Sequence, residues 1–537
     1  MVNSSVIYLE GKFCDDNCLL VSVETLLALF VLKCCDNLDV DIVFTSKCKG
    51  NSSVFKIQKI SYNIEYKKFE ECPSMIQNCT LPALKVRNEN IVVVGLSASL
   101  RYVLLSKAER DPDHISNRLL GFRKSCLQAC AEVSVWTKFC EVDIVEMIKD
   151  IYFNYNSQSF QKLSIPVHII RYEKHLQKPP ILHNALRRKQ EHFEKTLDNK
   201  TLVIEMKKLK LNELPDLEHV YAEGIDFSVA DLLLYVSFTL CFHRLGNMIE
   251  FEKVSPHVIK WLSELNKLEI ITKGKSIFSM VMEQFPPFPS KNDIEIIYPE
   301  VPDESLYKSD PNRYKPRWRS FTHQEDIDKV MNILEKKISF EESQELSDIL
   351  FHKLKSETLN AIQEPKSIKM YSLQFEKDLV WESYPDEVVP LEGDLPLSRF
   401  ERKCQQLESL AQIVISLAKE GDKIVDFCSG GGHLAILLAH CLPNCKLLLV
   451  ENKKNSLDKA IRRVKKLNLE NVEFYQCNLD YFAGDFDIGI CLHACGVATD
   501  LIMQKCCNQL SRFVCSPCCY GSVRPNHVLS YPRSSLI

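Results

Sequence analysis

Short apolar runs alternate with amphipathic segments over residues 398–537, a pattern typical of strands and helices that follow one another in an α/β fold. We expect strands at 424–426, 447–450, 472–476, 486–492 and 513–515. We expect helices at 398–419, 434–442 and 457–467. Parallel strands joined by helices bring their carboxyl ends to one edge of the sheet, where ligands of such folds bind. The pattern therefore predicts an open sheet with a ligand site at that edge.

The first half of the chain divides into two predicted parts. Residues 1–110 alternate strand-like and helix-like runs, which indicates a small α/β unit. Residues 111–283 carry mostly helical periodicity. Within them, Ser228 and Asp231 form a capping-box pattern, and Pro256 begins another predicted helix.

Residues 284–322 are rich in proline and are predicted to be a linker, and residues 323–397 are predicted to be a charged helical spacer. The linker ends in cations that alternate with aromatic residues: Arg313, Tyr314, Lys315, Arg317, Trp318 and Arg319. Such a stretch can lie along an RNA phosphate backbone while its rings stack on bases. A solvated linker anchored by its tryptophan is the alternative.

Composition limits the functions that the whole chain can have. The net charge of the 537 residues is -4, so a general nucleic-acid-binding surface is excluded and any such contact must be local. The 23 cysteines are an odd number and include adjacent pairs, which favours reduced thiols in the cytosol or the nucleus over disulfides, and we expect a cytoplasmic protein. The apolar run 19–32 is short and contains Glu24, so we expect a core helix there and no membrane span.

A glycine-rich loop follows the first predicted strand of the C-terminal part. Asp426 is followed after three residues by Gly430, Gly431 and Gly432, and glycines let a ligand approach the main chain closely. Glu451 ends the next strand, where an acidic side chain can accept hydrogen bonds from ribose hydroxyls. A nucleoside site is the functional hypothesis, and a plain turn is the structural alternative.

The later strand ends carry further candidates. Asn478 with its neighbour Leu479 is placed to meet an adenine. His493 and Cys495 are candidate catalytic residues, because a histidine near its reference pKa can accept a proton. A histidine that only shapes the loop is the alternative. His493, Cys495 and the cysteines at 515, 518 and 519 could gather, yet paired cysteines in apolar strands are usually buried, so no metal is expected.

These strand ends resemble those of class I S-adenosylmethionine-dependent methyltransferases. The segments 493–500 and 517–520 are similar to those of a branch that includes tRNA 2′-O-methyltransferases, although Ala494 and Tyr520 depart from its pattern. The resemblance implies S-adenosylmethionine as cofactor, with Asp426 and the glycines at its amino-acid end, and it suggests RNA as the methyl acceptor. The fold it implies is Rossmann-like.

The first half resembles glutathione transferases. Phe227–Asp231 and Pro256–Trp261 are similar to motifs of their helical domain, and Leu81–Leu84 resembles the cis-proline segment of their thioredoxin-like half. No activating residue is selected among Tyr8, Cys14 and Cys18, and Ser97 is an isolated candidate for a glutathione contact. We therefore expect a non-catalytic module that does not bind glutathione and that contacts a protein partner or a second copy of the chain.

The expected fold is thus a thioredoxin-like unit, an all-α glutathione-transferase-like domain and a Rossmann-like domain whose sheet is incomplete. Class I sheets usually have seven strands and five are predicted before Ile537, so we expect a C-terminally truncated form. The expected function is methyl transfer. A non-enzymatic scaffold with a vestigial cofactor fold is the first alternative, and glutathione conjugation is the second.

Overall fold

The computed structural model describes residues 5–15, 18–36, 38–46, 54–58, 64–154, 162–182, 184–196, 204–210, 212–290, 295–307, 379–390, 399–517 and 529. The chain divides into two units, one made of 1–308 with 377–537 and the other of 309–376. All the described residues belong to the first unit. The fold below is therefore that of the first unit.

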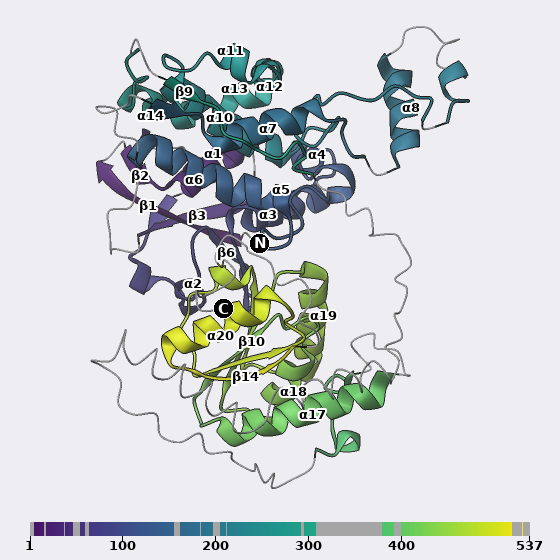
Figure 1. The fold of residues 1–537 in the computed structure, drawn as a ribbon. Helices are drawn as coiled ribbons and strands as arrows, with labels where there is room; N and C mark the ends of the chain where they lie inside the picture. The colour runs from purple at the N-terminus through teal and green to yellow at the C-terminus, as the bar shows by residue number, and fades with distance from the viewer. Residues whose placement is uncertain are drawn as a thin grey trace, which may run out of the picture. The chain divides into compact units, whose positions relative to one another are not determined.

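The C-terminal part is a parallel sheet covered by helices on both faces (Figure 1). Its strands are β10 (Lys423–Phe427), β11 (Lys446–Glu451), β12 (Val472–Gln476), β13 (Ile488–Leu492) and β14 (Arg512–Ser516). Its helices are α17 (Phe400–Leu417), α18 (His433–Cys441), α19 (Lys454–Leu467) and α20 (Val497–Gln509), with a 3-10 turn η8 (Leu479–Tyr481). The strands lie side by side in the order β14-β13-β10-β11-β12. Successive strands are added on one side of β10 as far as β12 and then on its other side from β13, so the strand order switches between β10 and β13. This confirms the expected α/β sheet.

The two faces of this sheet bury different side chains of the same strands. Ile424 and Leu449 pack with apolar residues of α17, α18 and α19. Val425 and Leu448 pack on the other face, with residues of α20. Successive residues of a strand point to opposite faces, and both faces are covered, so these strands are apolar along their whole length.

The N-terminal part contributes seven strands to the same sheet. They are β1 (Ser5–Asp15), β2 (Cys18–Val21), β3 (Val40–Thr45), β4 (Phe55–Gln58), β5 (Ile64–Tyr66), β6 (Ala83–Lys85) and β7 (Ile91–Val94). The helices between them are α1 (Val23–Cys34), η1 (Phe69–Glu71) and α2 (Ser74–Gln77), and α3 (Leu96–Arg110) follows β7. β3 is parallel to β1, β6 is antiparallel to β1 and to β7, and the Leu81–Pro82 peptide before β6 is cis.

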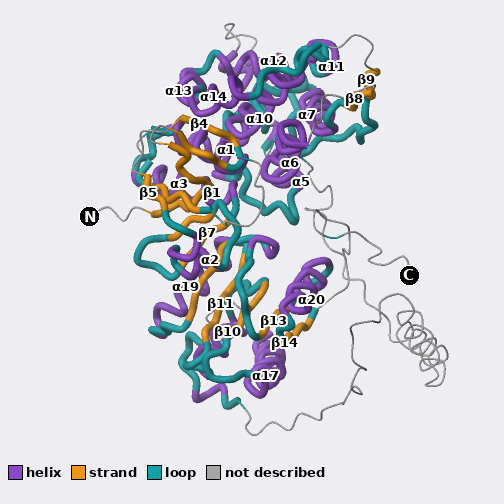
Figure 2. The backbone as a smooth tube through the Cα atoms, turned by 90° about the vertical axis from the view of Figure 1, so that its left-hand side faces the viewer, coloured by secondary structure: helices purple, strands orange, loops and turns teal. Residues whose placement is uncertain are grey.

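One strand pair joins the two parts. β7 runs parallel to β12, with Val92 opposite Tyr475, and the N–H of Phe474 donates to the carbonyl of Asn90 at 2.8 Å. The described strands of both parts therefore form one sheet of twelve strands (Figure 2). The sequence pattern did not predict this pairing.

The helical part packs around the long buried helix α10. Its elements are α4 (Ile115–Leu119), η2 (Phe122–Lys124), α5 (Val135–Lys138), η3 (Phe139–Asp143), α6 (Ile144–Lys149), η4 (Asp150–Asn154), α7 (Val167–Gln177), α8 (Ala185–Thr196), α10 (Val229–Leu245), α11 (Phe251–Val254), α12 (Pro256–Asn266), α13 (Glu269–Gly274) and α14 (Ser276–Gln284). The Ser228 N–H donates to the Asp231 carboxylate at 2.9 Å, and the Trp261 indole donates to its other oxygen at 3.0 Å. The predicted capping box is therefore present, and Asp231 also ties α12 to α10.

Part of the predicted linker is folded against these helices. A short strand β9 (Glu295–Ile297) pairs with β8 (Lys162–Ser164), and Phe288 and Leu306 are buried. Residues 379–390 contain a 3-10 turn, η5 (Trp381–Ser383), and their Val388 lies in the core beside α17. No described helix combines the length and the apolar character that crossing a bilayer requires.

Candidate functional site

The glycine loop joins β10 to α18 and leaves room beside its backbone. Gly430 and Gly432 have φ angles of 57° and 73°, a region that side chains with a Cβ rarely adopt. A Cβ on Gly432 would lie 2.9 Å from the Cβ of Ala460, so close packing also requires glycine there. A Cβ on Gly430 would meet nothing within 4 Å. The loop is therefore tight on its inner side and open at Gly430.

Glu451 lies against this loop. Its Oε2 accepts a hydrogen bond from the N–H of Gly430 at 2.8 Å, and its Oε1 accepts one from the N–H of Lys453 at 2.8 Å. The carboxylate is 8% exposed, and both hydrogen bonds come from backbone groups. The structure thus brings the acidic strand end and the glycine loop together, as the sequence predicted. Each carboxylate oxygen keeps lone pairs for further donors.

Asp426 is buried at the end of β10. Burial, together with the charge of the nearby Glu451, raises the pKa of its carboxyl to about 8, although the N–H of Ala435 and the charge of Lys403 lower it. At pH 7 this carboxyl is therefore largely neutral. Lys403 comes from α17, and the sequence did not single it out, because its approach to Asp426 depends on how that helix packs.

A buried arginine supports the loop from behind. Arg463 donates through its guanidinium to the carbonyls of Gly431 at 3.0 Å and Glu387 at 2.8 Å, and its side chain is 3% exposed. The sequence of α19 did not indicate that Arg463, one of several cationic residues in this helix, is buried. The residues around 387 cover Arg463, and no local pattern predicts that contact.

The end of β12 meets the N-terminal part of the chain. The backbone N–H of Leu479, a predicted adenine contact, donates to Glu132 Oε1 at 2.9 Å. The amide of Asn452, the residue after Glu451, donates to the thiol of Cys130 at 3.0 Å. Asn478, the residue before Leu479, is buried. The loop that carries Cys130 and Glu132 thus lies at the predicted nucleoside site, and sequence reasoning missed it.

The proposed catalytic residues lie at the end of β13. His493 is exposed, has a φ of 68°, and its backbone N–H donates to the carbonyl of Ser516 at 3.1 Å. Partial burial and the charge of Lys403 lower the pKa of His493. Cys495 is partly buried on the loop that follows. Since β10 and β13 pair in parallel, Asp426 and His493 lie at the same edge of the sheet.

Other predicted residues cannot be placed. The cysteines at 518 and 519 and the basic stretch that contains Arg313, Lys315, Arg317, Trp318 and Arg319 lie outside the described residues. Within the described part of the chain, no group of three or more histidine, cysteine or acidic side chains is arranged to bind a metal ion.

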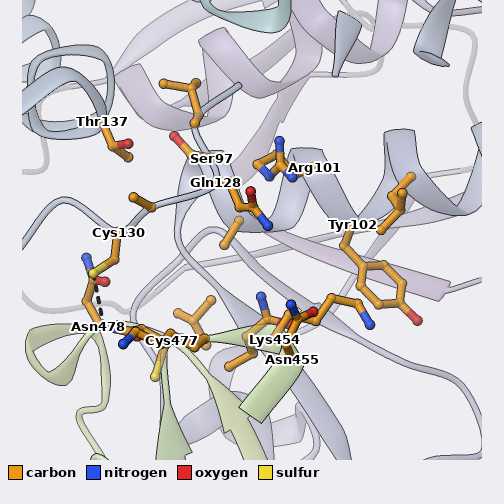
Figure 3. Close-up of a pocket in the computed structure, with 18 of the residues that line it drawn as sticks. Ser97, Arg101, Tyr102, Gln128, Cys130, Thr137, Lys454, Asn455, Cys477 and Asn478 are labelled. Atoms are coloured by element: carbon orange, nitrogen blue, oxygen red, sulfur yellow. Dashed lines mark hydrogen bonds between the residues drawn. The ribbon is translucent and has the colours of Figure 1, made fainter. Parts of the chain in front are cut away.

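A cavity of about 600 Å³ lies beside this site (Figure 3). Asn478 and residues 452–456 line it from the C-terminal part, and residues of α3 and several residues between 123 and 137 line it from the N-terminal part. At its wall, burial raises the pKa of Glu141 to about 7, although the hydroxyls of Ser97 and Tyr481 and the Leu96 N–H lower it. The glycine loop and Glu451 do not line the cavity.

Comparison with known proteins agrees with this geometry. A family model described as a methyltransferase domain matches residues 402–526, which hold the glycine loop and all five parallel strands of the C-terminal part. A glutathione S-transferase C-terminal domain-containing protein homolog of Drosophila pseudoobscura pseudoobscura is 34% identical over 543 residues, covering 98% of this chain and 85% of that protein. The chain belongs to the family of glutathione S-transferase C-terminal domain-containing proteins.

The family also includes the human glutathione S-transferase C-terminal domain-containing protein, which is 31% identical over 607 residues, covering 99% of this chain and 87% of the human protein. Among solved structures, a magnesium protoporphyrin IX methyltransferase from Synechocystis with bound S-adenosylmethionine is 19% identical. That match covers 16% of this chain and 42% of the other, with a TM-score of 0.15, too low to support the assignment of the fold. The assignment depends on the strand order and on the family model.

Proposed function

We propose that this chain is an S-adenosylmethionine-dependent methyltransferase whose cofactor lies on the glycine loop. The observation that carries the proposal is the 2.8 Å hydrogen bond from the N–H of Gly430 to Glu451. It sets a carboxylate suited to ribose hydroxyls beside a loop whose outer side is open. When bound, the cofactor supplies a methyl group on a sulfonium sulfur.

The residues of the chain have distinct tasks in this proposal. Glu451 uses its remaining lone pairs to hold the ribose, and Asn478 with Leu479 meets the adenine. Gly430–Gly432 and Asp426 hold the amino-acid end, where a neutral Asp426 can both donate and accept hydrogen bonds. Direct methyl transfer depends on alignment more than on a strong base, so positioning is the main contribution of the protein.

His493 is proposed as the proton acceptor for the methylated group. Its lowered pKa keeps the imidazole neutral at pH 7, and its exposure at the strand end lets an acceptor reach it. Cys495 is proposed to line the same approach. RNA is the proposed acceptor, on the strength of the sequence pattern of Arg313, Lys315, Arg317, Trp318 and Arg319.

The N-terminal half is proposed to be a non-catalytic glutathione-transferase-like module. The order β5-β3-β1-β6-β7 with β6 antiparallel, together with the helices α1 and α3, supports a thioredoxin-like unit. Burial raises the pKa of Tyr8 to about 12, the opposite of the shift that would activate a phenol. We propose that the helical part contacts a protein partner or a second copy, and that the protein is cytoplasmic, which agrees with its free thiols.

A scaffold without enzymatic activity is the second candidate. The observation in its favour is Glu132, whose carboxylate takes the Leu479 N–H that an adenine would use. A protein in which this contact is permanent has no free purine site.

Isothermal titration calorimetry of the full chain with S-adenosylmethionine tests the proposal. We expect binding by the wild type, at least a tenfold loss in Glu451→Ala, and no change in Glu420→Ala, an exposed glutamate that contacts Asn444 near the start of β10. A wild type that does not bind supports the scaffold. Binding that Glu451→Ala leaves intact contradicts the proposed site. Titration with glutathione in parallel tests the conjugation alternative.

A further inference from the structure

The cavity of about 600 Å³ is lined on one side by the N-terminal part of the chain and on the other by the C-terminal part. Ser97 and Arg101 come from α3 on one side, and Lys454, Asn455 and Asn478 come from the C-terminal part on the other (Figure 3). Its volume of about 600 Å³ lies within the range of small-molecule sites, roughly 300–1,000 Å³. The cavity is therefore large enough for a ligand of nucleotide size.

Positive charge dominates the lining. Five cationic side chains line the cavity against two carboxyl groups, and the cations are Arg101, Arg123, Lys124, Lys453 and Lys454. Lys454 also contacts Asp458 at 2.8 Å along its own helix. The carboxyl groups are those of Glu109 and Glu141, and burial favours the neutral form of Glu141. The cavity thus favours an anion.

The first turns of two long helices lie at opposite walls of the cavity. Helix α3 has 15 residues, and its first N–H, that of Leu96, already donates to Glu141. Helix α19 has 14 residues, starts after Lys453 and has no side-chain N-cap. Residues of both first turns, Ser97 and Lys454 among them, line the cavity. The N–H groups and the positive end of the α19 dipole therefore add to the cationic lining.

A buried hydroxyl group lies at the same wall. Ser97 is 3% exposed, and its Oγ lies against the carboxyl of Glu141, whose pKa it lowers. The hydroxyl therefore has a neighbour within the protein and adds one polar group to the wall.

We propose that this cavity binds a small molecule that carries phosphate groups, at a site separate from the glycine loop. The N-terminus of α19 and a set of lysines and arginines on facing walls match a ligand with negative charge at more than one position. The proposal does not depend on methyl transfer, because neither Gly430 nor Glu451 lines the cavity. Asn478 belongs to both sites, so the two ligands would be neighbours.

Calorimetric titration of the full chain with inorganic pyrophosphate and with ADP tests this site, with adenosine as the uncharged control. We expect both phosphate compounds to bind, and adenosine to bind at least tenfold more weakly than ADP. Adenosine and ADP are compared with S-adenosylmethionine present, so that the glycine-loop site is filled. If neither phosphate compound binds, or if adenosine then binds as tightly as ADP, the proposal is overturned.

A pair of double variants locates the binding. K453Q/K454Q removes two cations from the cavity wall and should weaken pyrophosphate binding at least tenfold. K465Q/K466Q removes the same charge from the far end of α19 and should change it less than twofold. Thermal unfolding confirms that both variants are folded. An equal effect of the two variants overturns the site.

Competition separates this proposal from the proposed function. We expect saturating S-adenosylmethionine to leave pyrophosphate bound, because the two sites are distinct. Competitive displacement would place the cavity within the cofactor site and end the proposal. Pyrophosphate binding by a chain that does not bind S-adenosylmethionine would uphold this site and refute only the methyltransferase.

Discussion

The carboxylate of Glu132 accepts a hydrogen bond from the backbone N–H of Leu479 at 2.9 Å, across 347 positions of sequence. A carboxylate held by a backbone donor in a partly buried place contributes more than a neutral hydrogen bond. The contact ties the N-terminal half to the strand end that we assign to adenine. A purine at that strand end therefore has to displace Glu132 or share its donor.

Removal of this carboxylate should favour the cofactor. In Glu132→Ala the Leu479 N–H is free, and we expect the Kd for S-adenosylmethionine to fall about tenfold, the equivalent of one charged hydrogen bond of about 1.5 kcal/mol. Calorimetry measures the change, with Glu109→Ala, which removes an exposed carboxylate of α3, as the control. Weaker binding in Glu132→Ala would instead make Glu132 part of the cofactor site.

Two glycines of one loop should respond differently to alanine. Gly432→Ala adds a Cβ 2.9 Å from Ala460 at a positive φ, so we expect a loss of about 3 kcal/mol in the free energy of unfolding. Gly430→Ala meets no atom within 4 Å and should lose only about 1 kcal/mol. Its Cβ enters the space given to the cofactor, so S-adenosylmethionine binding should be lost in a folded protein. Urea unfolding and calorimetry test both, and an unchanged affinity in Gly430→Ala would contradict the assignment.

Two neighbouring arginines of α19 provide a matched comparison. Arg463→Met leaves the carbonyls of Gly431, Glu387 and Val388 without their donor, and we expect a destabilisation of about 3 kcal/mol. Arg462 is exposed, so Arg462→Met should change stability by less than about 0.5 kcal/mol. Urea unfolding of both variants checks the difference. Equal stabilities would mean that the glycine loop does not depend on Arg463.

Glu141 should make stability depend on pH near neutrality. Its pKa is about 7 in the folded protein, above its ordinary value of 4.5. The folded state therefore binds the proton more tightly, so this contribution is complete below about pH 4.5 and is lost as pH rises through 7. Relative to Glu141→Gln, the wild type should lose stability over that window, on the order of 3 kcal/mol at most.

Thermal unfolding of both proteins between pH 5 and pH 8 measures this loss. Burial also raises the pKa of Glu223 to about 7 and that of Asp231 to about 6, but these groups titrate in both proteins. The difference between the two curves therefore isolates Glu141. Parallel curves would mean that Glu141 titrates normally.

The sequence predicted the contacts that follow from local order. Asp426, the glycines and Glu451 lie at the ends of consecutive parallel strands, and such ends share one edge of a sheet, so their proximity could be inferred. The capping box of Ser228 and Asp231 spans three residues and was equally accessible.

Contacts between distant segments could not be inferred. Glu132 lies in a loop without any motif, and only the folded chain brings it to Leu479. Arg463 appears in a run of cations, and its burial depends on residues near 387 that cover it. The pairing of β7 with β12 could not be predicted either, because several apolar strands of similar length are possible partners and the sequence pattern does not distinguish among them.

The pairing of β7 with β12 also constrains how the protein can be handled. A fragment that starts at residue 399 would lack β7 and would expose the edge of β12 at Phe474, Tyr475 and Gln476. The unpaired backbone N–H and C=O groups of an exposed strand edge favour self-association. Expression of the C-terminal part alone should therefore give precipitate, whereas one polypeptide carrying both halves shields that edge internally. Work with purified material should begin from the uncut chain.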